Sequence, residues 1–117
     1  KTNLKDAVKQ IIIDNEKYFV KFFNIAESIN IRIHVLELFP GIGKKTVWLI
    51  LEERKKKVFT SFEDIKTRTG IDPVKILTEK IVKEIEGSEK YFVFIKPPQP
   101  GAGYYLRYLE LIYEEPL

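Results

Sequence analysis

The stretch Leu36-Glu37-Leu38-Phe39-Pro40-Gly41-Ile42-Gly43-Lys44-Lys45-Thr46-Val47-Trp48-Leu49-Ile50-Leu51 decides how this chain is organised. Apolar residues predict a helix over residues 31–39 and a second helix that includes residues 46–51. Pro40 disfavours helical backbone at the residue before it, so the first helix is expected to end at that point. The two glycines that follow tolerate positive φ and the close approach of another backbone. The stretch therefore predicts two helices joined by a tight turn.

The turn opens directly into a helix, which makes it a candidate anion site. The first N–H groups of a helix have no partner within the helix, and the helix dipole is positive there. Lys44 and Lys45 add positive charge at the same place. We therefore expect the N–H groups of Gly41, Ile42 and Gly43, with the charge of both lysines, to bind a phosphate of a nucleic-acid backbone.

These residues resemble the hairpin of the helix-hairpin-helix motif. Proteins with that motif grip the DNA or RNA backbone through hairpin N–H groups, so the resemblance implies binding without sequence preference. Such hairpins usually have a small residue where this chain has Val47, which implies that the two helices cross less closely. The alternative is a plain αα-hairpin whose glycines serve only the turn. Two lysines at a helix start argue against that alternative, because they oppose the dipole unless an anion is present.

Positive charge is concentrated after the turn. Residues 44–57 include six basic and two acidic residues, a net charge of +4 against +3 for the whole chain. A local basic patch is typical of proteins that bind a nucleic-acid backbone. We expect Arg54, Lys55, Lys56 and Lys57 to form a second contact with the backbone. The same four residues also complement the negative end of the helix dipole.

Length and composition limit the remaining classes. The chain has 117 residues, enough for one domain or one domain with an appendage. Apolar residues make up 44% and charged residues 32%, which is typical of a soluble globular protein and excludes disorder. No apolar run is long enough to span a bilayer, and without cysteine there is no disulfide or thiolate metal site. We expect a cytoplasmic protein without a cofactor, a metal or a membrane partner.

Helical spacing of apolar residues predicts two helices before the turn, over residues 4–13 and 15–26. The second helix carries an aromatic stripe, which we interpret as core. His34, the only histidine, has no second ligand or nucleophile near it in the sequence, and we expect it on a helix surface or partly buried.

A second turn is predicted further along the chain. A capping-box pattern, Thr60 with Glu63 or Ser61 with Asp64, starts a short helix. After that helix, Gly70-Ile71-Asp72-Pro73 occupies the place of a second hairpin, with Asp72 as the cap of the helix that follows. A carboxylate at this point would repel a phosphate. We therefore expect the second hairpin to pack without binding.

The C-terminal part combines a short apolar run with a returning one. Residues 91–95 predict a strand, and 97–103 a loop rich in proline and glycine. Residues 104–113 predict a returning strand, although the spacing of Leu106, Leu109 and Tyr113 also suits a helix. Such a β-hairpin is marginal alone and must pack on the helices, another domain or a second copy. The tyrosines suggest stacking on RNA bases, but we interpret them as cover for a core.

These elements predict a mainly α (α+β) fold. N-terminal helices over residues 1–30 pack on the core, residues 31–86 form a tandem helix-hairpin-helix unit, and residues 87–117 form a C-terminal β-hairpin extension.

The chain also resembles a whole family over residues 4–96. The matching runs are Asn15–Asn24, Pro40–Lys45, Glu52–Arg54 and Ser61–Ile65. Together they resemble the archaeal domain-of-unknown-function family 655. The resemblance implies binding to RNA or DNA, without an established reaction, and an OB-like barrel that precedes the helical part. No such barrel is encoded here, and the first residue is lysine, so we expect part of the natural N-terminus to be absent.

Two other classes of function were compared with nucleic-acid binding. Base-excision glycosylases use a related hairpin, with a lysine at the position of Lys45 and an aspartate further on. Here Glu63 and Asp64 lie in a capping box, and too little chain precedes the hairpin to form a pocket for a flipped base, so we do not expect an enzyme. The second class is a protein-interaction module that uses the aromatic C-terminal hairpin, with the helices as scaffold.

Overall fold

The structure, a computed structural model, describes residues 3–114. The predicted segments 1–30 and 87–117 include residues 1–2 and 115–117, which lie outside that part. The described elements are α1 (Leu4–Asp14), α2 (Glu16–Ile25), the 3₁₀-helix η1 (Val35–Leu38), α3 (Lys44–Lys56), α4 (Phe62–Thr69), α5 (Pro73–Glu86), β1 (Tyr91–Phe92), β2 (Tyr104–Tyr105) and α6 (Tyr108–Glu114). The mainly α fold class is confirmed.

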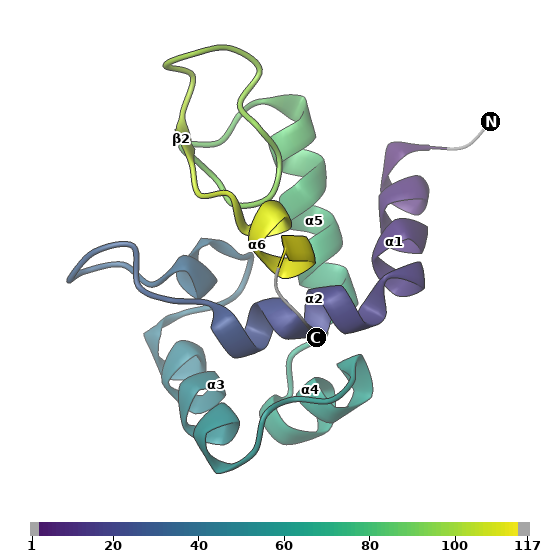
Figure 1. Cartoon of the computed structure of the whole chain (residues 1–117), viewed down its shortest axis with the longest axis vertical. Helices are drawn as coiled ribbons and strands as arrows, with labels where there is room; N and C mark the ends of the chain where they lie inside the picture. The colour runs from purple at the N-terminus through teal and green to yellow at the C-terminus, as the bar shows by residue number, and fades with distance from the viewer. Residues whose placement is uncertain (1–2, 115–117) are drawn as a thin grey trace.

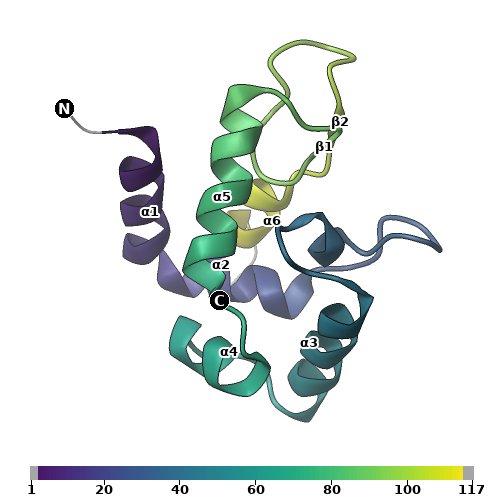
Figure 2. The same cartoon turned by 180° about the vertical axis from the view of Figure 1, so that it is seen from behind.

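The helices lie around α2 (Figures 1 and 2). In both views α1 lies beside α5, α2 runs across the middle of the molecule, and α3 and α4 lie below it. Within residues 3–114 no helix combines the length and the apolar character that a bilayer crossing requires.

Side-chain caps fix several helix boundaries where the sequence predicts them. The Ser61 hydroxyl accepts the Asp64 N–H at the start of α4, and the Asp72 carboxylate accepts the Lys75 N–H at the start of α5. Pro73 occupies the first turn of α5, and Gly70 ends α4 with a φ of 80°. The predicted second turn between α4 and α5 is therefore present.

The predicted helix over residues 31–39 is wrong, because only η1 is helical there. The Asn30 side chain accepts the N–H groups of Arg32 and Ile33, and the Ile29 N–H donates to the Ile33 carbonyl. An asparagine side chain that bonds to the nearby backbone competes with helix formation. Residues 28–34 form a loop instead, closed by a bridge between Ser28 and His34.

The C-terminal part contains the expected small sheet, but its two strands are parallel. Tyr91 pairs with Tyr104, and Phe92 pairs with Tyr105. The predicted strand over residues 104–113 is too long, since β2 ends at Tyr105 and α6 follows. The helical spacing of this segment, the alternative considered above, prevails because α6 packs on α2.

The core is centred on Phe22, which is fully buried. Its ring centroid lies 5.4 Å from that of Phe39, 4.9 Å from that of Phe94 and 5.2 Å from that of Tyr108. Phe22 therefore joins α2 to the turn before α3, to the chain after β1 and to α6. The interpretation of the α2 aromatic stripe as core is confirmed.

The chain after β1 is held by a buried carboxylate. Glu84 on α5 accepts the N–H groups of Val93, Phe94 and Ile95 at 2.6, 2.9 and 2.9 Å. Lys80 lies 3.3 Å from Glu84 and is also buried. Buried backbone N–H groups need acceptors. Glu84 supplies acceptors for residues 93–95, because these residues lie beyond the end of β1.

We expect Glu84→Gln to lower the free energy of unfolding by about 3 kcal/mol, because an amide replaces the charged acceptor and breaks a buried ion pair. Urea denaturation measures this change. The matched control is Glu86→Gln, an exposed position on the same helix, which should change stability by less than about 0.5 kcal/mol. Equal stability of both variants would show that the carboxylate does not hold the segment.

Candidate nucleic-acid interface

The first hairpin is a tight turn that Gly41 makes feasible. Gly41 has a φ of 76°, in the left-handed region that other residues avoid, whereas Gly43 is extended, with φ −102° and ψ −176°. The Ile42 N–H donates to the Phe39 carbonyl at 3.2 Å, and the Ile42 side chain is buried. The expectation that Ile42 presents its N–H to a phosphate is therefore wrong, since this N–H closes the turn.

The start of α3 differs from those of α1, α4 and α5, while α2 also lacks a side-chain cap but has Glu16 in its first turn. α1, α4 and α5 each receive a side-chain cap, from Asn3, Ser61 and Asp72, but Gly43 gives α3 none. No acidic residue lies in the first turn of α3. Among residues 3–114, no acceptor bonds to the N–H groups of residues 43–46. The start of α3 is therefore a positive helix end without an internal counter-charge.

The two hairpins lie side by side. An open groove of ≈ 520 Å³ is lined by Pro40, Gly41 and Ile42 on one side and by residues 69–72 on the other. The structure thus brings the two predicted turns together. Asp72 and Glu79 place carboxylates on the second side of the groove. Only the first hairpin has a helix start that suits an anion.

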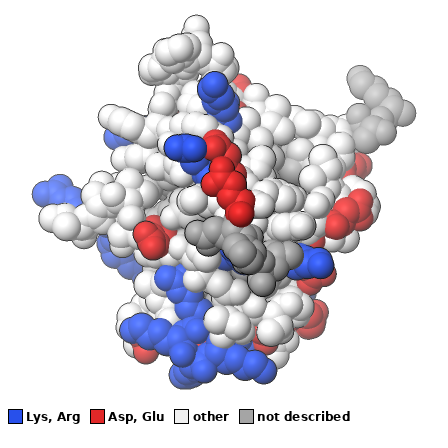
Figure 3. Space-filling view, viewed as in Figure 1, with Lys and Arg blue, Asp and Glu red and all other residues white. Residues whose placement is uncertain are grey.

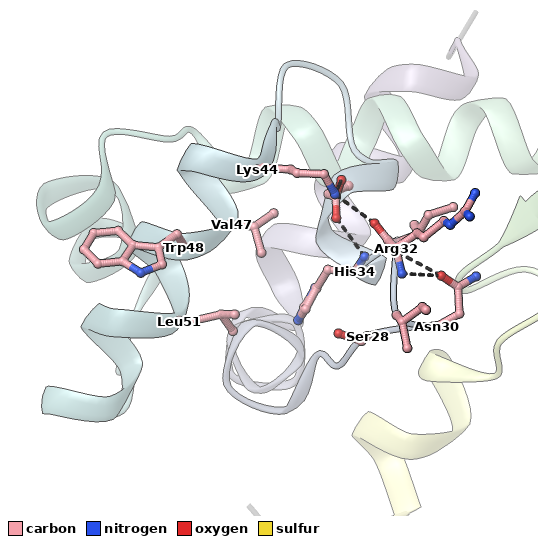
Figure 4. A pocket seen from close by; sticks show the side chains of 11 residues that line it. Ser28, Asn30, Arg32, His34, Lys44, Val47, Trp48 and Leu51 are labelled. Atoms are coloured by element: carbon pink, nitrogen blue, oxygen red, sulfur yellow. Dashed lines mark hydrogen bonds and ion pairs between the residues drawn. The ribbon is translucent and has the colours of Figure 1, made fainter.

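The two lysines of the first hairpin have different roles. The Lys44 ammonium donates to the Arg32 carbonyl at 2.8 Å and to the Glu37 carboxylate at 3.0 Å (Figure 4). The His34 N–H and Lys44 together lower the pKa of Glu37. Lys44 therefore ties the loop over residues 28–34 to α3. Lys45 is exposed and bonds to no other residue in the described part of the chain.

Arg54 makes hydrogen bonds that hold α3 against the end of α2. Its guanidinium donates to the Phe23 carbonyl at 3.1 Å and to the Ala26 carbonyl at 2.8 Å, and so satisfies the last carbonyls of α2. Burial lowers the pKa of Arg54. The Nη1 group of Arg54 is therefore occupied within the protein, which argues against the expected backbone contact.

The remaining basic cluster lies at the far end of α3. Lys55 pairs with Glu52 at 3.2 Å and Lys56 with Glu53 at 3.0 Å, while Lys57 is exposed. In Figure 3, Lys and Arg side chains gather at the lower edge of the molecule, over this end of α3. From Lys45 to Lys56 the helix rises about 16 Å, so the two groups would contact different phosphates.

Arg68 stabilises the fold, a role that the sequence analysis did not predict. Its guanidinium bonds to the carboxylates of Glu53 and Asp64 and to the carbonyls of Glu53 and Lys57, and it lies 4.5 Å from the centre of the Phe59 ring. Arg68 therefore joins the end of α3 to α4. Only the ion pair with Asp64 has regular helical spacing, whereas Glu53 and Lys57 lie 15 and 11 residues away in the sequence.

Glu63 and Asp64, which were compared above with the aspartate of base-excision glycosylases, make hydrogen bonds that stabilise the fold. The Thr60 N–H, followed by Arg68, lowers the pKa of Asp64, which lies in the first turn of α4. Glu63 accepts from the Thr67 hydroxyl at 3.4 Å. In the part of the chain that the structure describes, no three His, Asp or Glu side chains gather as a metal site would need.

His34 is the buried cap of η1. Its Nδ1 accepts the Leu36 N–H at 3.1 Å, and its own backbone N–H donates to Glu37 at 2.8 Å. Burial, followed by the charge of Arg54, lowers the pKa of His34 below 6.5. Neutral His34 therefore holds the turn that leads into the hairpin.

We expect stability to fall as the pH drops from 7.5 to 5.5. The folded-state pKa of His34 is lowered, so its contribution is complete above its unfolded pKa and is lost as the pH falls through its folded pKa. Urea denaturation across this range measures the change. In His34→Asn, a neutral cap, the part of the dependence that comes from His34 should disappear, whereas the buried Glu84 carboxyl, whose pKa burial raises, is unchanged in this variant. An equal slope in this variant would contradict the assignment.

The family described as "Protein of unknown function (DUF655)" matches residues 1–96, so the chain belongs to this family.

The chain is 42% identical over 98 residues to the uncharacterized protein MJ0038 of Methanocaldococcus jannaschii, covering 82% of this chain and 45% of that protein. The crystal structure of Af1531 from Archaeoglobus fulgidus matches with 48% identity and a TM-score of 0.71, over 78% of this chain and 52% of that one. This chain thus spans about half the length of these relatives.

Proposed function

We propose that this protein binds the backbone of DNA or RNA without sequence preference, through the start of α3. The observation that carries the proposal is the helix start at Gly43, which lacks a side-chain cap and an acidic first-turn residue and is followed by two lysines. A phosphate would supply the missing acceptor and the missing negative charge.

The neighbouring hairpin supports this reasoning by contrast. At the start of α5, the Asp72 carboxylate already accepts the Lys75 N–H at 3.2 Å. A phosphate there would meet a negative charge instead of free donors. The two hairpins lie on one groove, so one binds and the other completes the packing around it.

The expected roles of the basic residues change accordingly. Gly43 and the residues after it offer N–H groups, and Lys45 supplies a free charge. Lys44 reaches Glu37 and Arg32 and positions the loop. Lys55, Lys56 and Lys57 give a second, weaker contact, since two of them are already paired. Binding needs no cofactor and no catalytic residue. The N-terminal OB-like domain that the family resemblance implies would add affinity.

The sharpest test is Gly43→Asp. The backbone at Gly43 is extended and a Cβ atom there would meet nothing within 4 Å, so the variant should fold. Aspartate is a good helix cap and should raise stability by roughly 0.3 kcal/mol. Its carboxylate occupies the anion position, so affinity for an oligonucleotide should fall at least about tenfold. Fluorescence anisotropy with a labelled oligonucleotide at several salt concentrations measures this.

Gly43→Asn is the matched control, because it caps the helix without charge and should lose less affinity than the aspartate. Lys45→Ala should reduce the slope of log K against log salt by about 1. Affinity that is equal in wild type and Gly43→Asp would exclude the hairpin as the binding site. No binding by wild type would exclude the proposed function and favour the protein-interaction module.

A further inference from the structure

Trp48, the only tryptophan, is 63% exposed on the first half of α3. A tryptophan usually contributes a large buried area to a core or an interface. Trp48 instead lines an open hollow between α3 and the loop over residues 28–34, with most of its ring exposed (Figure 4). One face of the most polarisable side chain in the protein is therefore open beside the candidate phosphate site.

The surroundings of Trp48 are cationic. Lys44 and Lys45 precede it by four and three residues, which places them one helical turn nearer the start of α3. Arg32 is exposed on the loop across a hollow of ≈ 260 Å³ that Trp48 and Lys44 also line. Glu37, which lines the same hollow, and Glu52, four residues after Trp48, already form ion pairs with Lys44 and Lys55.

We propose that Trp48 is a stacking platform for an unpaired nucleobase, so that the preferred ligand is single-stranded nucleic acid. This inference rests on the proposed phosphate site at the start of α3. Base stacking on an exposed aromatic ring is sequence-tolerant, because every base has a π-face. It adds affinity without adding base specificity, in agreement with backbone binding.

The spacing along α3 fits one nucleotide. Four residues of α-helix rise about 6 Å, which is the separation of Trp48 from the start of α3 along the helix axis. This separation is comparable with the reach from a phosphate of a flexible strand to a neighbouring base. One phosphate at Gly43 and one base on Trp48 can therefore belong to the same short segment.

A duplex cannot use the same platform. Its bases are stacked on each other, and only their edges are accessible in the grooves. A single strand or a loop exposes base faces, which aromatic side chains can cover. Charge favours this occupant over an apolar protein partner, because the cations around Trp48 complement a phosphate backbone.

The fluorescence of Trp48 reports this contact directly, since no other tryptophan contributes. We would titrate the protein with oligothymidylate and with a blunt DNA duplex at low salt. The single strand should quench the emission, and the duplex should leave it unchanged. Trp48→Ala should weaken binding of the single strand, measured by anisotropy, about 5- to 150-fold. Trp48→Phe, which keeps an aromatic face, should restore most of the affinity.

Ile11→Ala is the control, because Ile11 is 56% exposed on α1 and outside this surface; it should bind like wild type. Quenching by the single strand together with loss in Trp48→Ala supports the platform. Unchanged affinity in Trp48→Ala, with loss in Gly43→Asp, overturns the platform and leaves the phosphate site standing. No binding of either oligonucleotide by wild type overturns both proposals.

Discussion

The packing of Phe22 against the rings of Phe39, Phe94 and Tyr108 is the interaction on which the rest of the structure depends. These rings come from four separate segments of the chain, so their packing joins parts that are far apart in the sequence. Phe39 directly precedes the hairpin, so the turn is anchored in the core by its first residue. The backbone at the start of α3 is thereby held in a fixed position, which a site made of N–H groups requires.

The candidate site is defined by what the fold leaves unsatisfied. Arg54 satisfies the end of α2, Arg68 joins α3 to α4, and Lys44 holds the loop before η1. Each of these cations contributes mainly to stability, although Lys44 and Arg54 belong, in the sequence, to the basic patch of residues 44–57. Within residues 3–114, the N–H groups of residues 43–46 have no acceptor and the Lys45 ammonium has no ion-pair partner. This difference separates the residues that we assign to binding from those that shape the protein.

Local sequence signals predicted most of the helices and the second turn. The Ser61 and Asp72 caps and the aromatic spacing of α2 act within a few residues, so the sequence alone reveals them. The loop before η1 was missed because one asparagine side chain outweighs an apolar pattern. The role of Arg54 was missed because its acceptors lie 28 and 31 residues away. The parallel pairing of β1 with β2 joins Tyr91 to Tyr104 and Phe92 to Tyr105, which lie far apart in the chain, and no local pattern encodes it.

The most direct test of the central claim is a ¹H–¹⁵N NMR titration with a short single-stranded oligonucleotide. We expect the largest changes in amide chemical shift at residues 43–46, together with the indole N–H of Trp48. Smaller changes are expected at Lys55, Lys56 and Lys57. Shifts concentrated in residues 104–113, with none at the start of α3, would contradict the account and place the binding surface on the C-terminal tyrosines.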